Sequence, residues 1–323
     1  MSGHHHDEDH AGHDHDHDHG YHHGSRGHQH APASFGKAFA IGITLNLAYV
    51  LGEAFYGVLA HSLALLADAG HNFGDVLGLG GAWLAAVLGK RLPSGRYTYG
   101  LRRLSILAAL SNAIVLLVVT GGIAWEGIRR LLEPQPVAGS IIMAVAAVGI
   151  TINGITALLF MAGRKDDLNI KGAFLHMASD ALVALGVVVA GAAILWTGWR
   201  WIDPAISLAV SVVIVFGTWG LLRDSMDLAL DAVPPGIDLA KVAAFLQKLP
   251  GVEAVHDLHI WGMSTTEIAL TAHLVRPGAG IDDDMLHSVS EELREHFGIS
   301  HATLQVENGA GARLCALQPD EVV

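Results

Sequence analysis

Two short motifs place a histidine and an aspartate four residues apart within apolar stretches. The run LLADAGHNFGDVLG contains His71 and Asp75, and the run GAFLHMASDALV contains His176 and Asp180. Residues four apart lie on one face of an α-helix. Two such faces that meet supply two imidazoles and two carboxylates, which is a full tetrahedral ligand set for Zn²⁺. The motifs therefore predict a metal site between two helices.

Other interpretations of these residues remain open. In one alternative, each His–Asp pair only forms a hydrogen bond within its own helix. Two buried carboxylates would then have no function, although ionisable side chains inside a bilayer are costly and usually functional. A relay that carries only protons would use the same residue types. Asp68, one turn before His71, is open as a ligand, a supporting residue or a near-surface residue. Glu53, Asn112 and Asn153 are polar residues of apolar stretches without an assigned role.

A histidine-rich segment favours metal over protons alone. Residues 1–34 hold twelve of the 21 histidines, alternating with aspartate in runs such as HAGHDHDHDHG. Because this segment has very few apolar residues, it cannot form a core, and we expect it to be a disordered tail. Imidazole and carboxylate together suit Zn²⁺ and its neighbours, which predicts weak, multivalent metal capture. An expression tag is the alternative interpretation of this segment.

Six apolar stretches must position the two motifs. Only 15% of the residues are charged, against about 25% in soluble domains. Each stretch has about 20 residues, enough for one membrane-spanning helix. They lie near Phe39–Leu59, Leu63–Leu88, Ser105–Trp125, Ile141–Met161, Gly172–Trp196 and Ile202–Leu222. We therefore predict a six-helix transmembrane domain over residues 35–223.

Lysine and arginine predict the orientation of this domain. The loops after the second and fourth stretches carry Lys90, Arg91, Arg96, Arg102, Arg103, Arg164, Lys165 and Lys171. The opposite side carries only Arg129, Arg130 and Arg200. Basic loops stay in the cytoplasm. With an even number of spans, both termini are expected there too.

A domain of different composition follows, over residues 232–310, before a flexible tail over residues 311–323. Its predicted elements are helix Leu239–Lys248, strand Ala254–Trp261, strand Glu267–Val275, helix Asp283–Phe297 and strand Ala302–Val306. Two helices on one face of three strands make a small α+β domain. In the run HDLHIW, His256 and His259 are three apart, so a regular strand would point them to opposite faces.

Four runs together resemble the cation diffusion facilitator family, and its bacterial and vertebrate zinc-transporter branch most of all. These runs are HSLALLADAGHNFGD, RYTYGLRR, LHMASD and VHDLHIW, and the resemblance extends from Phe35 to Glu307. It implies a homodimer with six helices per chain, a cytoplasmic ferredoxin-like domain, and exchange of metal for protons. His71, Asp75, His176 and Asp180 match its transport-site positions. Relatives with aspartate in place of His71 accept cadmium more readily, so His71 favours zinc.

The same resemblance implies a second metal site, in the cytoplasmic domain. It places His256, His273 and Glu307 at metal positions, and His301 near a further histidine of some relatives. Zn²⁺ would then also be a regulatory ligand that tightens the dimer. Gln305 stands where some bacterial relatives have histidine.

Two further positions bear on metal binding. Arg102 occupies the place of a histidine of vertebrate relatives, and arginine cannot ligate a metal. We therefore expect no metal site in that loop. Cys315 could supply a soft ligand from the C-terminal tail.

The sequence excludes several other functions. A formal net charge of −12 argues against nucleic acid as a partner. The chain has no GxxxxGK[ST] phosphate loop and no HExxH motif, so we expect neither an enzyme nor an organic cofactor. Neutral histidine and ionised aspartate bind metal, so protons compete with it. We therefore predict a proton-coupled antiporter that exports Zn²⁺ from the cytoplasm across a bacterial inner membrane. A membrane metal sensor and a passive divalent-metal channel are the alternatives.

Overall fold

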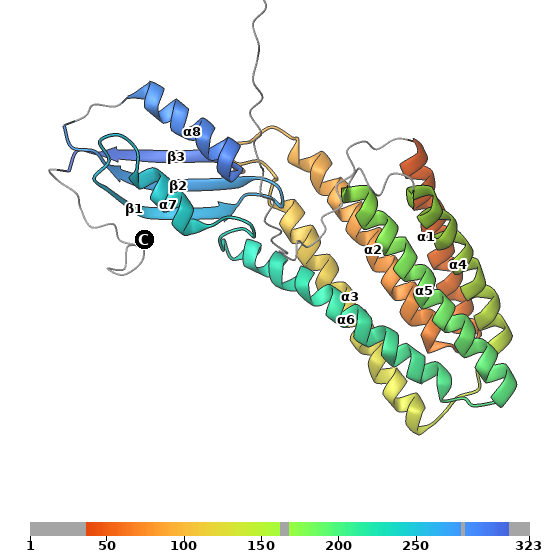
Figure 1. Cartoon of the computed structure of the whole chain (residues 1–323). Coiled ribbons are helices and arrows are strands. Elements are labelled where there is room, and N and C mark those ends of the chain that lie inside the picture. The colour runs from red at the N-terminus through yellow and green to blue at the C-terminus, as the bar shows by residue number, and fades with distance from the viewer. Residues whose placement is uncertain (1–36, 162–167, 279–281, 310–323) are drawn as a thin grey trace, which may run out of the picture.

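The computed structural model describes residues 37–161, 168–278 and 282–309. Within these residues, six long helices precede a small domain of two helices and three strands. The long helices are α1 (Lys37–Leu59), α2 (Leu63–Gly89), α3 (Leu104–Leu132), α4 (Gly139–Met161), α5 (Leu168–Thr197) and α6 (Ile202–Ala229). Figure 1 shows the bundle at one end of the molecule and the small domain at the other. The histidine-rich segment and the tail with Cys315 lie outside the described residues.

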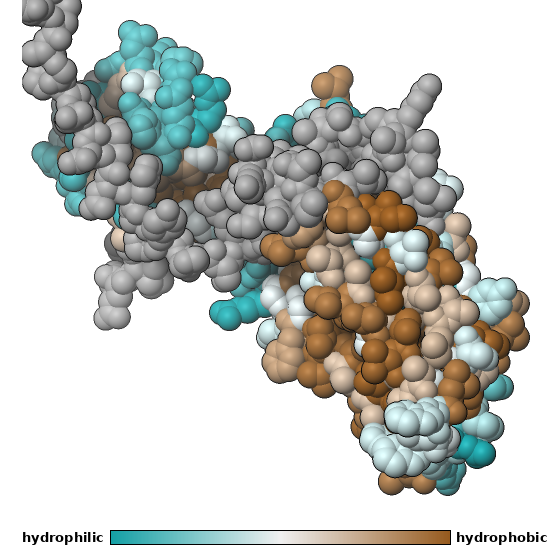
Figure 2. Space-filling view, turned by 45° about the vertical axis from the view of Figure 1, so that its right-hand side comes forward, coloured by the Kyte–Doolittle hydropathy of each residue, from teal (hydrophilic) through white to brown (hydrophobic). Residues whose placement is uncertain are grey.

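The surface of the bundle is that of a membrane protein. Helices α2 to α6 are each long and apolar enough to cross a membrane, judged on the described residues. The remaining long helix, α1, has 23 residues, which gives it a length of about 35 Å. Large apolar side chains such as Phe216 and Trp196 are exposed. Figure 2 shows apolar surface over the bundle and polar surface over the small domain. The predicted fold class, a six-helix membrane bundle followed by an α+β domain, is confirmed.

Helix α2 is central to the bundle. It packs against α1, α3, α5 and α6, whereas α4 packs mainly along α5 and α3 along α6. Both α3 and α6 continue past their apolar stretches into polar residues, because helical hydrogen bonding does not require apolar side chains. The packing brings the His–Asp motifs of α2 and α5 into reach of each other.

A buried carboxylate fixes the start of α2. The Oγ hydroxyl of Ser62 donates to Asp203 Oδ1 at 2.5 Å, and the amide of Leu63 donates to Asp203 Oδ2 at 2.8 Å. The amide of Ala64 donates to Asp203 Oδ1 at 3.3 Å. The first amides of a helix lack partners within it, and a negative charge there complements the helix dipole. Asp203, near the start of α6, therefore ties α6 to α2 at the end of the bundle far from the small domain.

The small domain has a three-stranded sheet covered on one face. Its elements are α7 (Leu239–Gln247), β1 (Ala254–Gly262), β2 (Ile268–Val275), α8 (Asp283–Phe297) and β3 (Ile299–Glu307). The strand order is β1-β2-β3, with β1 antiparallel and β3 parallel to β2. Alternate residues of the strands, such as Leu270 and Leu274, pack against Val242 of α7 and Leu293 of α8. The opposite face carries the polar residues of the strands.

The register of β1 differs from the expected regular strand. His256 lies opposite His273 and His259 lies opposite Thr271, with a β-bulge between them. Two residues of β1 therefore oppose one residue of β2. This extra residue moves the following residues of β1 to the opposite side from that expected for a regular strand. His273 and Thr271 share a face of β2, so His256 and His259 share a face as well. The expectation that these two histidines point to opposite faces is wrong, because it assumed an unbroken strand.

The bundle contacts the small domain through the segment before α3. Arg102 Nη1 lies 2.6 Å from Glu267 Oε1, next to the start of β2. Ser105 Oγ accepts a hydrogen bond from the amide of Thr265 at 3.1 Å. Arg103 also forms an ion pair with Asp231. The contacts of Arg102 and Ser105 connect the loop between α2 and α3, and the start of α3, to the turn between β1 and β2. The contact of Arg103 connects the same loop to the residues after α6.

Candidate metal centres

The four predicted transport-site residues lie together between α2 and α5. His176 Nε2 is 3.3 Å from Asp75 Oδ2 and 3.6 Å from Asp180 Oδ2. His71 Nε2 is 3.7 Å from Asp180 Oδ1 and 3.8 Å from Asp75 Oδ2. The two imidazole rings are 6.1 Å apart between centroids. Each histidine therefore contacts both carboxylates, one from its own helix and one from the other.

These distances match the requirements of a small tetrahedral ion. With metal–ligand bonds of about 2.0–2.1 Å, the edges of a tetrahedron are about 3.3 Å long. The four nitrogen–oxygen distances range from 3.3 to 3.8 Å. Asp75, His176 and Asp180 each have a ligand atom within 4.8 Å of the others. Small side-chain movements would place four ligands around one ion.

The cluster is not satisfied by its own hydrogen bonds. His71 Nδ1 and Asp75 Oδ2 are buried and have no hydrogen-bond partner among the described residues. The Asp180 side chain is only 4% exposed. A buried polar atom without a partner is unfavourable, and a buried charge more so. A bound cation or added protons would relieve this arrangement.

Three of the polar residues left open by the sequence are buried in the bundle. Glu53 is buried on α1, where it accepts hydrogen bonds from the Tyr49 hydroxyl at 2.9 Å and from Asn72 Nδ2 at 3.4 Å. Asp68 is buried, and its Oδ1 has no hydrogen-bond partner among the described residues. Asn153 is buried in α4. None of them contributes to the four nitrogen–oxygen contacts of the cluster.

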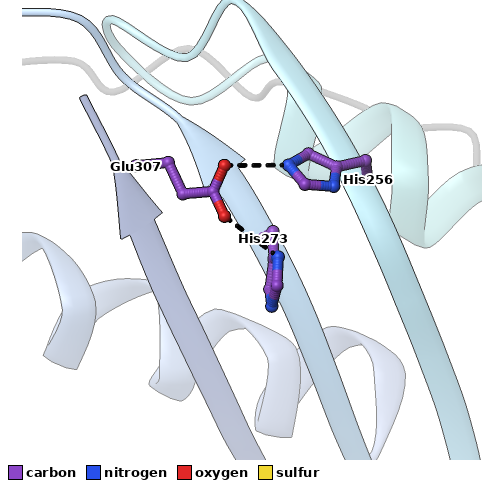
Figure 3. Close-up of side chains that lie close together, drawn as sticks. All are labelled: His256, His273 and Glu307. Atoms are coloured by element: carbon purple, nitrogen blue, oxygen red, sulfur yellow. Dashed lines mark hydrogen bonds and ion pairs between the residues drawn. The ribbon is translucent and has the colours of Figure 1, made fainter. Parts of the chain in front are cut away.

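A second cluster lies on the open face of the sheet (Figure 3). His256 of β1, His273 of β2 and Glu307 of β3 point toward one another from three adjacent strands. His256 Nε2 is 3.1 Å from Glu307 Oε2, and His273 Nδ1 is 3.1 Å from Glu307 Oε1. The three side chains have ligand atoms within 4.8 Å of one another. Two imidazoles and one carboxylate are a ligand set that suits Zn²⁺.

Hydrogen bonds keep the Glu307 carboxylate ionised. Loss of solvation by itself raises the pKa of Glu307, but the hydrogen bonds from His256 and Gln305 lower it by more. The pKa therefore lies below the ordinary value of glutamate. Gln305, predicted at a histidine position of some relatives, donates from Nε2 to Glu307 Oε1 at 2.9 Å. It acts on the cluster through Glu307.

Two residues beside this cluster were not predicted as part of it. Asp257 Oδ1 is 3.0 Å from His259 Nε2, and Asp257 Oδ2 is 3.5 Å from His273 Nε2. The bulge brings them to the face that carries His256. A single sequence gives little signal for a bulge, because its HDLH run also fits a regular strand.

The structure places one other predicted metal residue, His301, away from the clusters. His301 lies six positions before Glu307 on β3, which corresponds to about 20 Å along a strand. Its ring lies 5.7 Å from that of Tyr99, edge to face. His301 is therefore not brought to the cytoplasmic cluster within the chain. Arg102, expected to be no ligand, is paired with Glu267.

Comparisons with known proteins cover nearly all of the described chain. Residues 39–228 match the family model of the cation efflux transmembrane domain. Residues 234–309 match that of the cation efflux protein cytoplasmic domain. The metal-bound C-terminal domain of the CzcD transporter is 37% identical, with a TM-score of 0.20, over 22% of this chain and 99% of that domain.

Full-length relatives match with similar coverage. The zinc transporter ZitB of Escherichia coli is 37% identical over 83% of this chain and 86% of its own. The metal cation efflux system protein CzcD of Cupriavidus metallidurans is 34% identical over 87% and 90%. The cadmium, cobalt and zinc/H(+)-K(+) antiporter of Bacillus subtilis is 33% identical over 88% and 93%. The chain therefore belongs to the cation efflux family, the cation diffusion facilitators, and is a divalent metal cation efflux transporter.

Proposed function

We propose that the chain is a proton-coupled antiporter that exports chiefly Zn²⁺ through the cluster of His71, Asp75, His176 and Asp180. The observation that carries this proposal is the set of four nitrogen–oxygen distances of 3.3–3.8 Å between side chains of α2 and α5. They approach the edge of a Zn²⁺ tetrahedron, about 3.3 Å. The names of relatives that transport zinc, and of one zinc/H(+)-K(+) antiporter, support the same substrate and exchange.

Proton exchange follows from the chemistry of the ligands. Histidine binds metal only when neutral, and aspartate only when ionised. The ordinary pKa of histidine, about 6.5, allows proton exchange near neutral pH. Zn²⁺ leaves as protons enter from outside, and the protonated cluster returns to face the cytoplasm. Alternating access of this kind needs α2 and α5 to move relative to one another within each subunit.

The test is Zn²⁺ uptake into inside-out vesicles with an imposed proton gradient. We expect His71→Ala to abolish proton-driven uptake while the protein remains folded in detergent. His287→Ala is the matched control, since His287 is exposed on α8. Uptake by His71→Ala at the wild-type rate would refute the site.

The same vesicles separate antiport from the alternatives. A proton ionophore stops an antiporter, whereas a passive channel continues to equilibrate Zn²⁺. A membrane metal sensor would bind Zn²⁺ without any uptake. Either result would replace antiport by the corresponding alternative.

The arrangement in the cell is part of this proposal. We place the transporter in a bacterial inner membrane as a homodimer, with both termini and the small domain in the cytoplasm. The excess of basic residues in two loops supports this orientation. The match of residues 234–309 to the cytoplasmic domain of cation efflux proteins agrees with it.

The cytoplasmic cluster is proposed as a regulatory metal site. Its nitrogen and oxygen donors fit Zn²⁺, and His256, His273 and Glu307 would hold the ion. A ligand that binds one arrangement of the domain better than another shifts the protein toward that arrangement. Bound metal would therefore report cytoplasmic zinc to the transporter.

A further inference from the structure

The open face of the sheet holds a chain of contacts that extends beyond the regulatory cluster. His273 lies between two carboxylates: its Nδ1 is 3.1 Å from Glu307 Oε1, and its Nε2 is 3.5 Å from Asp257 Oδ2. Asp257 in turn is 3.0 Å from His259 Nε2. The row runs from Glu307 through His273 and Asp257 to His259.

The backbone at Asp257 has an unusual conformation that directs its side chain toward His273. Its φ is +53°, in the left-handed region that residues other than glycine seldom adopt. It lies in the β-bulge between His256 and His259. Bulges commonly re-aim a side chain beside a functional site. This one turns the carboxylate toward His273, and the Asp257 side chain is only 20% exposed.

Asp257 and His259 do not complete a separate ligand set. Among residues 37–161, 168–278 and 282–309, two groups have three ligand atoms within 4.8 Å of one another: His256–His273–Glu307 and Asp75–His176–Asp180. Asp257 belongs to neither. A histidine that binds metal usually donates its other ring N–H to a carboxylate, which fixes its tautomer and orientation. The position of Asp257 at His273 Nε2 matches that of such a carboxylate.

We propose that Asp257 is a positioning residue of the regulatory metal site, which accepts the Nε2–H of His273 and so presents Nδ1 to the metal, with His259 holding the carboxylate in place. This inference rests on the proposed metal site of His256, His273 and Glu307. It adds the interaction that determines which ring nitrogen of His273 binds the metal. It also assigns a role to His259, the second histidine of the HDLH run.

Replacement of Asp257 by glycine tests the carboxylate apart from the backbone. Glycine adopts positive φ without strain, so Asp257→Gly keeps the bulge and removes only the side chain. We expect the affinity of the cytoplasmic ion to fall about 10–100-fold, with the number of bound ions unchanged. Asp257→Asn keeps an oxygen acceptor without charge, so its affinity should lie between those of wild type and Asp257→Gly. The readout is titration of the full-length protein in detergent with Co²⁺, followed by absorbance.

Controls identify the ion and separate the possible failures. The Co²⁺ site that disappears in His256→Ala defines the cytoplasmic ion. Asp231→Gly is the matched control, because Asp231 also has a positive φ, of 60°, but is paired with Arg103. Its Co²⁺ affinity should equal that of wild type. Wild-type affinity in both Asp257→Gly and Asp257→Asn would overturn the proposal.

Loss of an ion is the other contrary result. If Asp257→Gly or His259→Ala binds one Co²⁺ fewer than the wild type, these residues are ligands, and the positioning role is wrong. If His256→Ala removes no ion, the regulatory site itself is refuted, which is a different failure. Wild-type thermal unfolding without metal would show that each variant is folded.

Discussion

The two clusters use similar residues but differ in how they are satisfied without metal. In the membrane, His71 Nδ1 and Asp75 Oδ2 are buried without hydrogen-bond partners among the described residues. On the sheet, Glu307 lies 3.1 Å from a nitrogen of both His256 and His273, and accepts a hydrogen bond from Gln305. The membrane cluster therefore needs a cation or protons, whereas the Glu307 carboxylate of the sheet cluster already has partners within the chain. The first suits obligatory exchange, and the second suits graded binding.

The location of each cluster accounts for this difference. The membrane cluster joins α2 and α5, the two helices that the proposed alternating access requires to move relative to each other. The cytoplasmic cluster lies on three hydrogen-bonded strands, where the register fixes the distances. Metal at the sheet must displace hydrogen bonds between the ligands, which lowers its net affinity.

The largest effect is expected from Asp180→Asn. Asp180 is the least exposed residue of the membrane cluster and contacts both histidines. The amide keeps the shape but loses the charge and one ligand oxygen. Loss of a supporting partner of a ligand costs about 10–100-fold, so loss of a ligand should reduce Zn²⁺ transport by about 100-fold or more. Flux into proteoliposomes measures it, and Co²⁺ binding at the sheet should be unchanged.

Glu307→Gln is expected to weaken metal binding at the sheet strongly and Zn²⁺ transport only modestly, the reverse of Asp180→Asn. The neutral amide should weaken metal binding at the sheet by about 100-fold. Transport should persist, slowed by about 5-fold, because coupling between distant sites is typically about 1–3 kcal/mol. Binding and flux measured on one preparation check this. If Glu307→Gln abolished flux as completely as Asp180→Asn, the distinction between the clusters would fail.

The two clusters also differ in how far the sequence predicts them. The His–Asp pairs were predictable, because helical periodicity relates spacing to a face directly. The row on the sheet was not: its bulge shifts His259 to the other face, and the resemblance alone assigned Glu307. The resemblance, and not spacing, grouped His301 with Glu307, because six positions along one strand already separate them by about 20 Å. The contact of Arg102 with Glu267 joins residues far apart in sequence, and no local pattern predicts it.

A smaller effect on stability is expected from Asp203→Asn. The carboxylate accepts hydrogen bonds from Ser62 and from the first amides of α2. An amide cannot accept all of them, so we expect a loss of about 1–2 kcal/mol. Thermal unfolding in detergent measures it. Asp227→Asn is the control, since Asp227 forms an exposed pair with Arg223 at 3.9 Å. Equal unfolding temperatures for the two variants would show that α2 is not anchored this way.

The smallest effect on stability, and the sharpest test of communication, is expected from Arg102→Gln. Arg102 and Glu267 are each 38% exposed, and exposed ion pairs contribute about 0–1 kcal/mol. Unfolding should therefore change little. The pair nevertheless connects the start of α3 with the turn before β2, the strand that carries His273. If regulation passes through this contact, Glu307→Gln should no longer slow transport in the Arg102→Gln background.

The wild type, the two single variants and the double variant form a double-mutant cycle measured by Zn²⁺ flux. Additive effects would mean that the two clusters communicate by another route, such as the contact of Arg103 with Asp231.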